Sequence, residues 1–266
     1  MKRILSVFLV LSVLVAGFSM FSSVVSAEEY ATQMPEIKEH GFITARDGAK
    51  IEYGVYGDSN KDVLIMLPCN GGDMHNFDGN LLPEFAEHFK VITVSPRGTG
   101  QSERGEGELT FDVEADDLLW LLDELEIDKA HFYGFSDGGN IALQLEVMYP
   151  GTLGAISTGG ANIFVEGSLI PSFAEEFLAE PNPNPLTRMM QIEPAMTPQD
   201  MQTIAAPALI MAGEHDLILE DHTRLIASNI PGAELKIIPG EDHGSYICNS
   251  PKLAPLMLEF FKEIGY

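Results

Sequence analysis

Short apolar runs alternate with amphipathic helical patterns along this chain, and this alternation restricts the fold more than any other feature. A half-exposed alternating run spans residues 51–56, and continuous or nearly continuous apolar runs span residues 63–67, 91–94, 208–211 and 235–238. Continuous runs of this length are typical of strands buried on both faces of a parallel sheet. Apolar residues at helical spacing fill 115–125 and 253–260. The sequence therefore predicts an α/β fold with a mostly parallel, twisted sheet flanked by helices.

The first 27 residues have the pattern of a secretory signal peptide. A basic start precedes an apolar run, and small residues end at Ala27, after which we expect cleavage. The alternative is an uncleaved membrane anchor, because residues 4–25 are long enough to span a bilayer. Both interpretations predict that the folded part, within 28–266, is secreted or otherwise outside the cytoplasm.

The charge balance excludes several classes of partner. Lys and Arg total 15 against 40 Asp and Glu, so the formal net charge is −25. Such an acidic chain is a poor ligand for nucleic acid or anionic lipid, which leaves a small molecule as the expected partner. Two cysteines are too few for a disulfide scaffold, and the seven histidines form no paired zinc motif. We expect neither a metal nor a cofactor, and the oligomeric state stays open.

A glycine-flanked serine lies between a predicted strand and a predicted helix. The motif Gly134-Phe135-Ser136-Asp137-Gly138 follows the strand at 130–133. A tight strand-to-helix turn projects a serine hydroxyl away from the backbone, where it can act as a nucleophile. The backbone N–H of Asp137 is an expected donor to an oxyanion. Its side chain is expected to cap the helix and not to act in catalysis.

An acid and a histidine follow two later strands in the order Ser…Asp…His. Asp216 follows the run at 208–212, and His243 follows the strand at 235–238. His243 is the expected general base, and Asp216 the group that orients its imidazole. Asp242 is the weaker candidate for the acid because it adjoins His243.

These motifs together resemble the α/β-hydrolase fold family, over roughly residues 40–266. The segment 95–102 is similar to that family's D-x-R-G-x-G-x-S loop, with Ser95 in the position of the aspartate. The family often has His-Gly after its third strand, where this chain has Pro68-Cys69. The resemblance implies that the backbone N–H of Asn70 is the second oxyanion donor, besides that of Asp137.

Two further expectations concern the segments around the site. Residues 161–202, called the lid segment below, are rich in proline and methionine, which favours a short helical insertion over the strand ends. Cys69 and Cys248 fall in loops expected at the same end of the sheet. They form a disulfide in one hypothesis and stay as two thiols in the favoured one.

The sequence thus predicts a secreted serine hydrolase that cleaves small, largely apolar carboxylic esters through an acyl-enzyme. The resemblance leaves other chemistries open: a lactonase, a thioesterase, a C–C hydrolase, a proline aminopeptidase or a perhydrolase. A serine nucleophile argues against dehalogenases and epoxide hydrolases, which would use an aspartate. The alternative from another class is a non-catalytic, ligand-binding protein on the same scaffold.

Overall fold

The computed structural model describes residues 34–79, 81–247, 250 and 252–266. The predicted signal peptide and Cys248, half of the hypothetical disulfide, lie outside these residues. The strands are β1 (Glu39–Thr44), β2 (Lys50–Tyr56), β3 (Val63–Leu67), β4 (Lys90–Val94), β5 (Ala130–Phe135), β6 (Leu153–Gly159), β7 (Ala208–His215) and β8 (Glu234–Asp242). The helices are α3 (Leu81–His88), α4 (Phe111–Glu124), α5 (Asp137–Met148), α6 (Pro171–Leu178), α7 (Pro185–Ile192), α8 (Pro198–Met201), α9 (Glu220–Asn229) and α10 (Leu253–Glu263).

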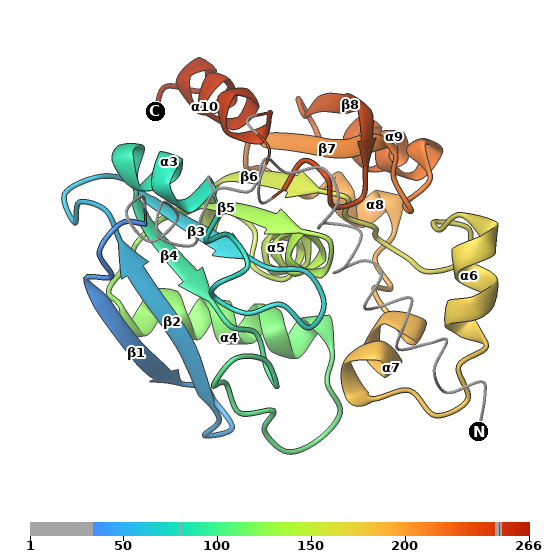
Figure 1. The fold of residues 1–266 in the computed structure, drawn as a ribbon, viewed down its shortest axis with the longest axis horizontal. Helices are drawn as coiled ribbons and strands as arrows, with labels where there is room; N and C mark the ends of the chain where they lie inside the picture. The colour runs from blue at the N-terminus through green and yellow to red at the C-terminus, as the bar shows by residue number, and fades with distance from the viewer. Residues whose placement is uncertain (1–33, 80, 248–249, 251) are drawn as a thin grey trace.

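All eight of these strands form one sheet in the order β1-β2-β4-β3-β5-β6-β7-β8 (Figure 1). β1 and β2 pair antiparallel, and β2 pairs antiparallel with β4, whereas β3 to β8 pair in parallel. The expected mostly parallel sheet is therefore confirmed. The chain order reverses at β3, whose two neighbours are β4 and β5. Ligands of open α/β sheets bind beyond the strand ends at such a reversal.

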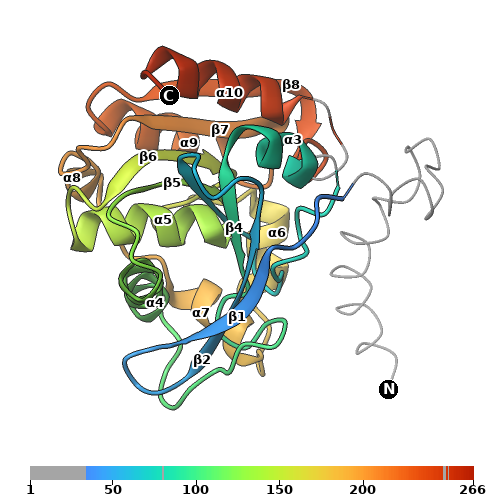
Figure 2. The ribbon, with the colours of Figure 1, turned by 90° about the vertical axis from the view of Figure 1, so that its left-hand side faces the viewer.

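Helices cover both faces of the sheet and enclose two cores (Figure 2). Successive strand residues alternate between them: Ile65 and Leu67 of β3 join one core, and Leu64 and Met66 join the other. Buried residues of α4, α5 and α9 pack in the first core, and those of α3 and α10 in the second. Burial on both faces explains why these strands are continuous apolar runs in the sequence.

The predicted strands and helices are all present, and the sequence reasoning missed β1, β6, α3 and α9. β6 is fully buried, but five of its seven residues, Leu-Gly-Ala-Ile-Ser-Thr-Gly, are small or carry a hydroxyl. Without a run of large apolar side chains, no strand signal stood out there.

Three short helices, α6, α7 and α8, connect β6 to β7, and α6 and α7 lie to one side of the sheet in Figure 1. They fall in the expected lid segment. The bridge between Phe164 and Ala195 closes the segment on itself, and the bridge between Leu169 and Ile218 joins it to the loop after β7.

A buried carboxylate from β2 stands beside Ser95, the residue that departs from the family pattern. Glu52 is 2% exposed and accepts hydrogen bonds from Ser95 Oγ, Gln101 N and Gln101 Nε2, each at 2.8 Å. His40 Nε2 lies 2.8 Å from the same carboxylate. These bonds hold the pKa of Glu52 below its usual value in spite of burial. The neighbouring strand thus supplies the negative charge that position 95 lacks.

We predict that Glu52→Ala lowers the free energy of unfolding by about 3 kcal/mol at pH 7, because buried donors lose their acceptor. The lowered pKa means that this contribution is present above pH 4.5 and is lost as the pH falls through the folded-state pKa. Urea unfolding of the wild type and of Glu52→Ala at pH 7, and again at a pH well below 4.5, measures this contribution and its loss. Glu36→Ala, which removes an exposed ion pair with Lys38, is the control and should leave stability unchanged. Equal stability of the wild type and Glu52→Ala at pH 7 would contradict the prediction.

Candidate active site

Ser136 occupies a strained turn between β5 and α5. Its φ of +55° lies in a region that side chains rarely adopt, and its ψ is −118°. The turn is held by backbone bonds, from Ser136 N to Gly159 O at 2.8 Å and from Gly139 N to Ser136 O at 2.8 Å. A Cβ on Gly134 would lie 2.1 Å from Gly138 O, and a Cβ on Gly138 would lie 2.3 Å from Leu67 O. Both glycines are therefore required for this close approach.

A chain of hydrogen bonds joins the three side chains expected to form a triad. His243 Nε2 lies 3.1 Å from Ser136 Oγ, and His243 Nδ1 lies 2.6 Å from Asp216 Oδ1. The Asp216 side chain is 1% exposed and that of His243 is 12% exposed. The serine and the acid therefore contact opposite nitrogens of one imidazole, which is the arrangement that general-base catalysis requires.

Backbone groups fix Asp216, and Asp242 is used elsewhere. Gly213 N and Ile218 N donate to the Asp216 carboxylate at 3.2 and 2.9 Å. The alternative acid, Asp242, accepts from Gly244 N and Ser245 N at 3.0 and 2.9 Å. Asp242 therefore shapes the turn after His243, and Asp216 is the acid that contacts the imidazole.

Asn70 lies in a tight turn directly after β3. Gly72 N donates to Cys69 O at 2.9 Å, and Gly71, with φ of +72°, takes the left-handed position of the turn. Cys69 is not among the described residues with positive φ, so the replacement of the usual glycine imposes no strain there. The backbone N–H of Asn70 makes no hydrogen bond with any residue that the structure describes. The assignment of this N–H as the second oxyanion donor stays a prediction.

The side chain of Asp137 does not cap α5, contrary to the sequence-based expectation. Its Oδ2 accepts from Asn70 Nδ2 at 2.8 Å, and α5 has no side-chain cap. The residue is 5% exposed, and burial raises the pKa of this carboxyl to about 6, against the opposing effects of Asn70 and His243. The carboxylate points to Asn70 because β3 and β5 are neighbours, a pairing that the linear sequence does not reveal.

Sequence reasoning missed two residues that touch the imidazole. Gly160 has φ of +63°, and a Cβ there would lie 2.7 Å from His243 Cε1 and 2.8 Å from Nδ1. The ring of Phe135 lies 5.0 Å from that of His243, centroid to centroid. The Gly159-Gly160 pair, in which Gly159 is the last residue of β6, was a usable signal, and it was overlooked because β6 itself was not recognised.

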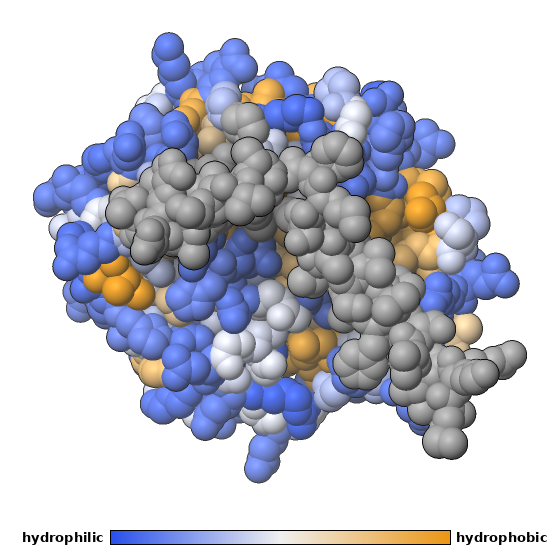
Figure 3. Space-filling model, in the orientation of Figure 1, coloured by the Kyte–Doolittle hydropathy of each residue, from blue (hydrophilic) through white to orange (hydrophobic). Residues whose placement is uncertain are grey.

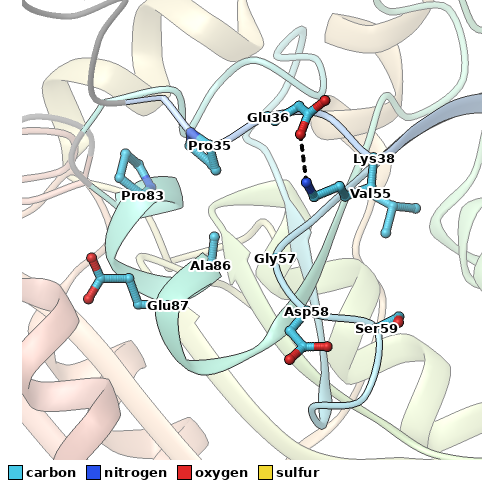
Figure 4. A pocket seen from close by; sticks show the side chains of 10 residues that line it. All are labelled: Pro35, Glu36, Lys38, Val55, Gly57, Asp58, Ser59, Pro83, Ala86 and Glu87. Carbon is cyan, nitrogen blue, oxygen red and sulfur yellow. Dashed lines mark hydrogen bonds and ion pairs between the residues drawn. The ribbon is translucent and has the colours of Figure 1, made fainter.

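A surface hollow is lined by none of these residues (Figure 4). It measures about 750 Å³ and is lined by residues of β2, of α3 and of the segment before β1. Its charged pair, Glu36 and Lys38, is joined at 2.7 Å. Nothing in this hollow resembles a nucleophile activated by a base.

The described residues form no cluster of three or more His, Cys, Asp or Glu side chains suited to a metal ion. Within the same part of the chain, no helix is long and apolar enough to cross a bilayer.

Comparison with known proteins places the chain in one family. A family model described as alpha/beta hydrolase fold matches residues 62–201, which include Ser136. The serine hydrolase BPHL of Homo sapiens is 24% identical over 247 residues, 82% of this chain and 85% of that protein. The dihydrolipoyllysine-residue acetyltransferase component of the Pseudomonas putida acetoin cleaving system is 28% identical over 166 residues, 61% of this chain but only 41% of that protein. The crystal structure of an esterase, RhEst1 from Rhodococcus sp. ECU1013, covers 86% of this chain and 99% of its own, with a TM-score of 0.73 and 17% identity.

We predict that Asp137→Asn stabilises the fold at pH 8 by about 3 kcal/mol. The pKa of Asp137 is raised from 3.8 to about 6, and each unit corresponds to about 1.4 kcal/mol. The native state therefore favours the neutral carboxyl; this advantage is complete below pH 3.8 and is lost as the pH rises through about 6. Urea unfolding of both proteins at pH 8 and at pH 3.5 measures the difference, which should vanish at the lower pH. Equal stabilities at pH 8 would contradict the prediction.

We predict that Gly160→Ala lowers kcat/KM by about 100-fold or more for any substrate that Ser136 attacks, because the new methyl group displaces His243. Alanine in a left-handed backbone conformation also lowers the free energy of unfolding by about 1 kcal/mol, at Gly160 and at the control position alike. Gly167→Ala is the matched control, since Gly167 has φ of +75° and nothing within 4 Å of its added Cβ. It should show the same loss of stability with unchanged kinetics. Unchanged kinetics in Gly160→Ala would show that the imidazole does not need its observed place.

Proposed function

Because the chain belongs to the α/β-hydrolase fold family, we propose that it is a serine hydrolase that cleaves small, largely apolar carboxylic esters. One observation carries the proposal: the hydrogen-bonded series Asp216–His243–Ser136, with the serine on a strained turn at the end of β5. This arrangement activates a hydroxyl that is otherwise a weak nucleophile.

In the first half of the reaction, Ser136 Oγ attacks the ester carbonyl carbon while its proton passes to His243 Nε2. Asp216 holds the Nδ1 proton and stabilises the imidazolium that forms. The carbonyl oxygen becomes an oxyanion, and the backbone N–H groups of Asn70 and Asp137 donate to it. When the tetrahedral intermediate collapses, the C–O bond to the alcohol breaks and the alcohol leaves with the proton from His243. The acyl group stays on Ser136.

In the second half, His243 takes a proton from water, and the resulting hydroxide attacks the acyl carbon. The same two N–H groups bind the second oxyanion. The bond to Ser136 Oγ then breaks, and the proton returns from His243 to the serine. The products are a carboxylic acid and free enzyme, so this cycle requires no cofactor.

The apolar character proposed for the substrate rests on the lid segment and on charge. Leu178 and Ile192 are exposed, and the rings of Phe173 and Phe177 stack at 5.4 Å on α6, a helix with no buried residue. Figure 3 shows hydrophobic side chains gathered near this end of the molecule. The net charge of −25 disfavours anionic substrates. An ester is preferred to an amide because an alcohol is the easier leaving group.

The human relative is named a serine hydrolase, which supports the proposed reaction class. A second part of the proposal concerns where the protein acts. We propose that the protein works outside the cytoplasm after cleavage at Ala27, on the basis of the sequence pattern of residues 1–27. The intact mass of protein recovered from an expressing cell tests this proposal, since cleavage removes those 27 residues.

We predict that a fluorophosphonate adds once to the wild type and not to Ser136→Ala, because only an activated serine attacks the phosphorus. Intact-mass measurement after incubation shows the adduct. Ser157→Ala is the control, since Ser157 is fully buried on β6, and it should still be labelled.

If the wild type takes the label, a fresh sample that was not treated with the fluorophosphonate is assayed with matched esters, lactones, thioesters and proline amides. Turnover of the esters, abolished in Ser136→Ala, is the expected result. If the wild type instead prefers the lactones, thioesters or proline amides, that substrate class replaces esters in the proposal, and the assignment as a serine hydrolase stands. An unlabelled, well-folded wild type would overturn the proposal in favour of a non-catalytic, ligand-binding protein.

A further inference from the structure

The side-chain amide of Asn70 is anchored on two sides. Its Nδ2 donates to Asp137 Oδ2 at 2.8 Å and to Leu186 O, on α7, at 3.3 Å. Both amide hydrogens are therefore used, one toward the serine turn and one toward the lid segment. The backbone N–H of the same residue is left without a partner among the described residues.

The buried Asp137 carboxylate lowers the stability of the fold, so its presence calls for a functional reason. The bond to Asn70 offers one. The carboxylate is buried directly after Ser136, and its Oδ2 contacts the side chain of Asn70, the residue proposed to bind the oxyanion. A negative charge there opposes the oxyanion and lowers the stability of the fold above pH 6. The charged or titratable groups that face it are Glu114 on α4, which is also buried, and His243. Neither donates a hydrogen bond to it in the structure; Asn70 is its donor.

We propose that Asp137 is a positioning residue for the oxyanion site. Its carboxylate holds the Asn70 side chain so that the Asn70 backbone N–H faces the reacting carbonyl. This inference rests on the function proposed above and deepens it. Among the residues that the structure describes, one backbone bond crosses the turn at 69–72, from Gly72 N to Cys69 O, and a glycine takes the third position of this turn. Such a turn can rotate its central peptide groups easily, and the side-chain anchor prevents this rotation.

The anchor also connects the oxyanion site to α7. Because Leu186 O accepts the second Asn70 hydrogen, the packing of the lid segment bears on the same turn that holds the oxyanion donor. Asn70 is thereby joined to both α5 and α7, although 67 residues separate it from Asp137 and 116 from Leu186.

A set of five variants separates positioning from folding. Asp137→Ala removes the acceptor together with a buried charge, so we expect a fold at least as stable as the wild type but a kcat lower by about 10- to 100-fold, with KM changed less than about threefold. Asp137→Asn keeps an acceptor oxygen for Asn70 and should restore kcat to within about threefold of the wild type. Glu114→Gln, which removes another buried acid without touching Asn70, is the control and should leave kcat unchanged. Asn70→Ala and the double variant Asn70→Ala/Asp137→Ala should be equally slow, because both lack the same contact.

The outcomes distinguish this inference from the proposed function. Wild-type kcat in Asp137→Ala, or losses that multiply in the double variant, would overturn the positioning role while the hydrolase function stands. If the wild type hydrolyses none of the substrates, hydrogen–deuterium exchange of residues 68–72 tests whether Asp137 holds the Asn70 turn in place. Faster exchange in Asp137→Ala but not in Glu114→Gln supports the anchor, and equal exchange refutes it.

Discussion

The N-terminus of α5 lies directly against the ends of β3 and β5, and the rest of the site depends on this contact. Gly134 and Gly138 permit it, since an added Cβ would come within 2.1 to 2.3 Å of backbone oxygens. The same contact forces Ser136 into its strained conformation and brings the turn at Asn70 beside it. The proposed nucleophile and the proposed oxyanion donor, from strands far apart in the sequence, thus meet because two glycines lack side chains.

Buried charge is balanced differently at the two acidic positions near the sheet ends. Glu52 has polar donors around it and a lowered pKa, so it stabilises the fold at neutral pH. Asp137 has one side-chain donor and a raised pKa, so it destabilises the fold there. The unfavourable charge lies next to the proposed nucleophile, as expected where stability and function conflict.

Much of the fold and of the site was predictable from the sequence. The strands β3, β4, β5 and β7 are apolar because both faces are largely buried, whereas the edge strand β8 is only partly buried. The three predicted site side chains directly follow β5, β7 and β8. β6 escaped prediction because small residues fill it, and Gly160 escaped with it. Glu52 gave no signal either, since a lone acid in a strand does not reveal that its partners are Ser95 and Gln101.

The sequence by itself determined which residues can do chemistry: a serine between glycines, and an acid and a histidine after later strands. Periodicity and motif spacing are local properties, so they are readable along the chain. The tertiary structure decided which of these groups touch. It selected Asp216 over Asp242, turned the Asp137 carboxylate toward Asn70 and placed Gly160 against the imidazole. These contacts depend on the order of strands in the sheet, which arises only when the whole chain packs.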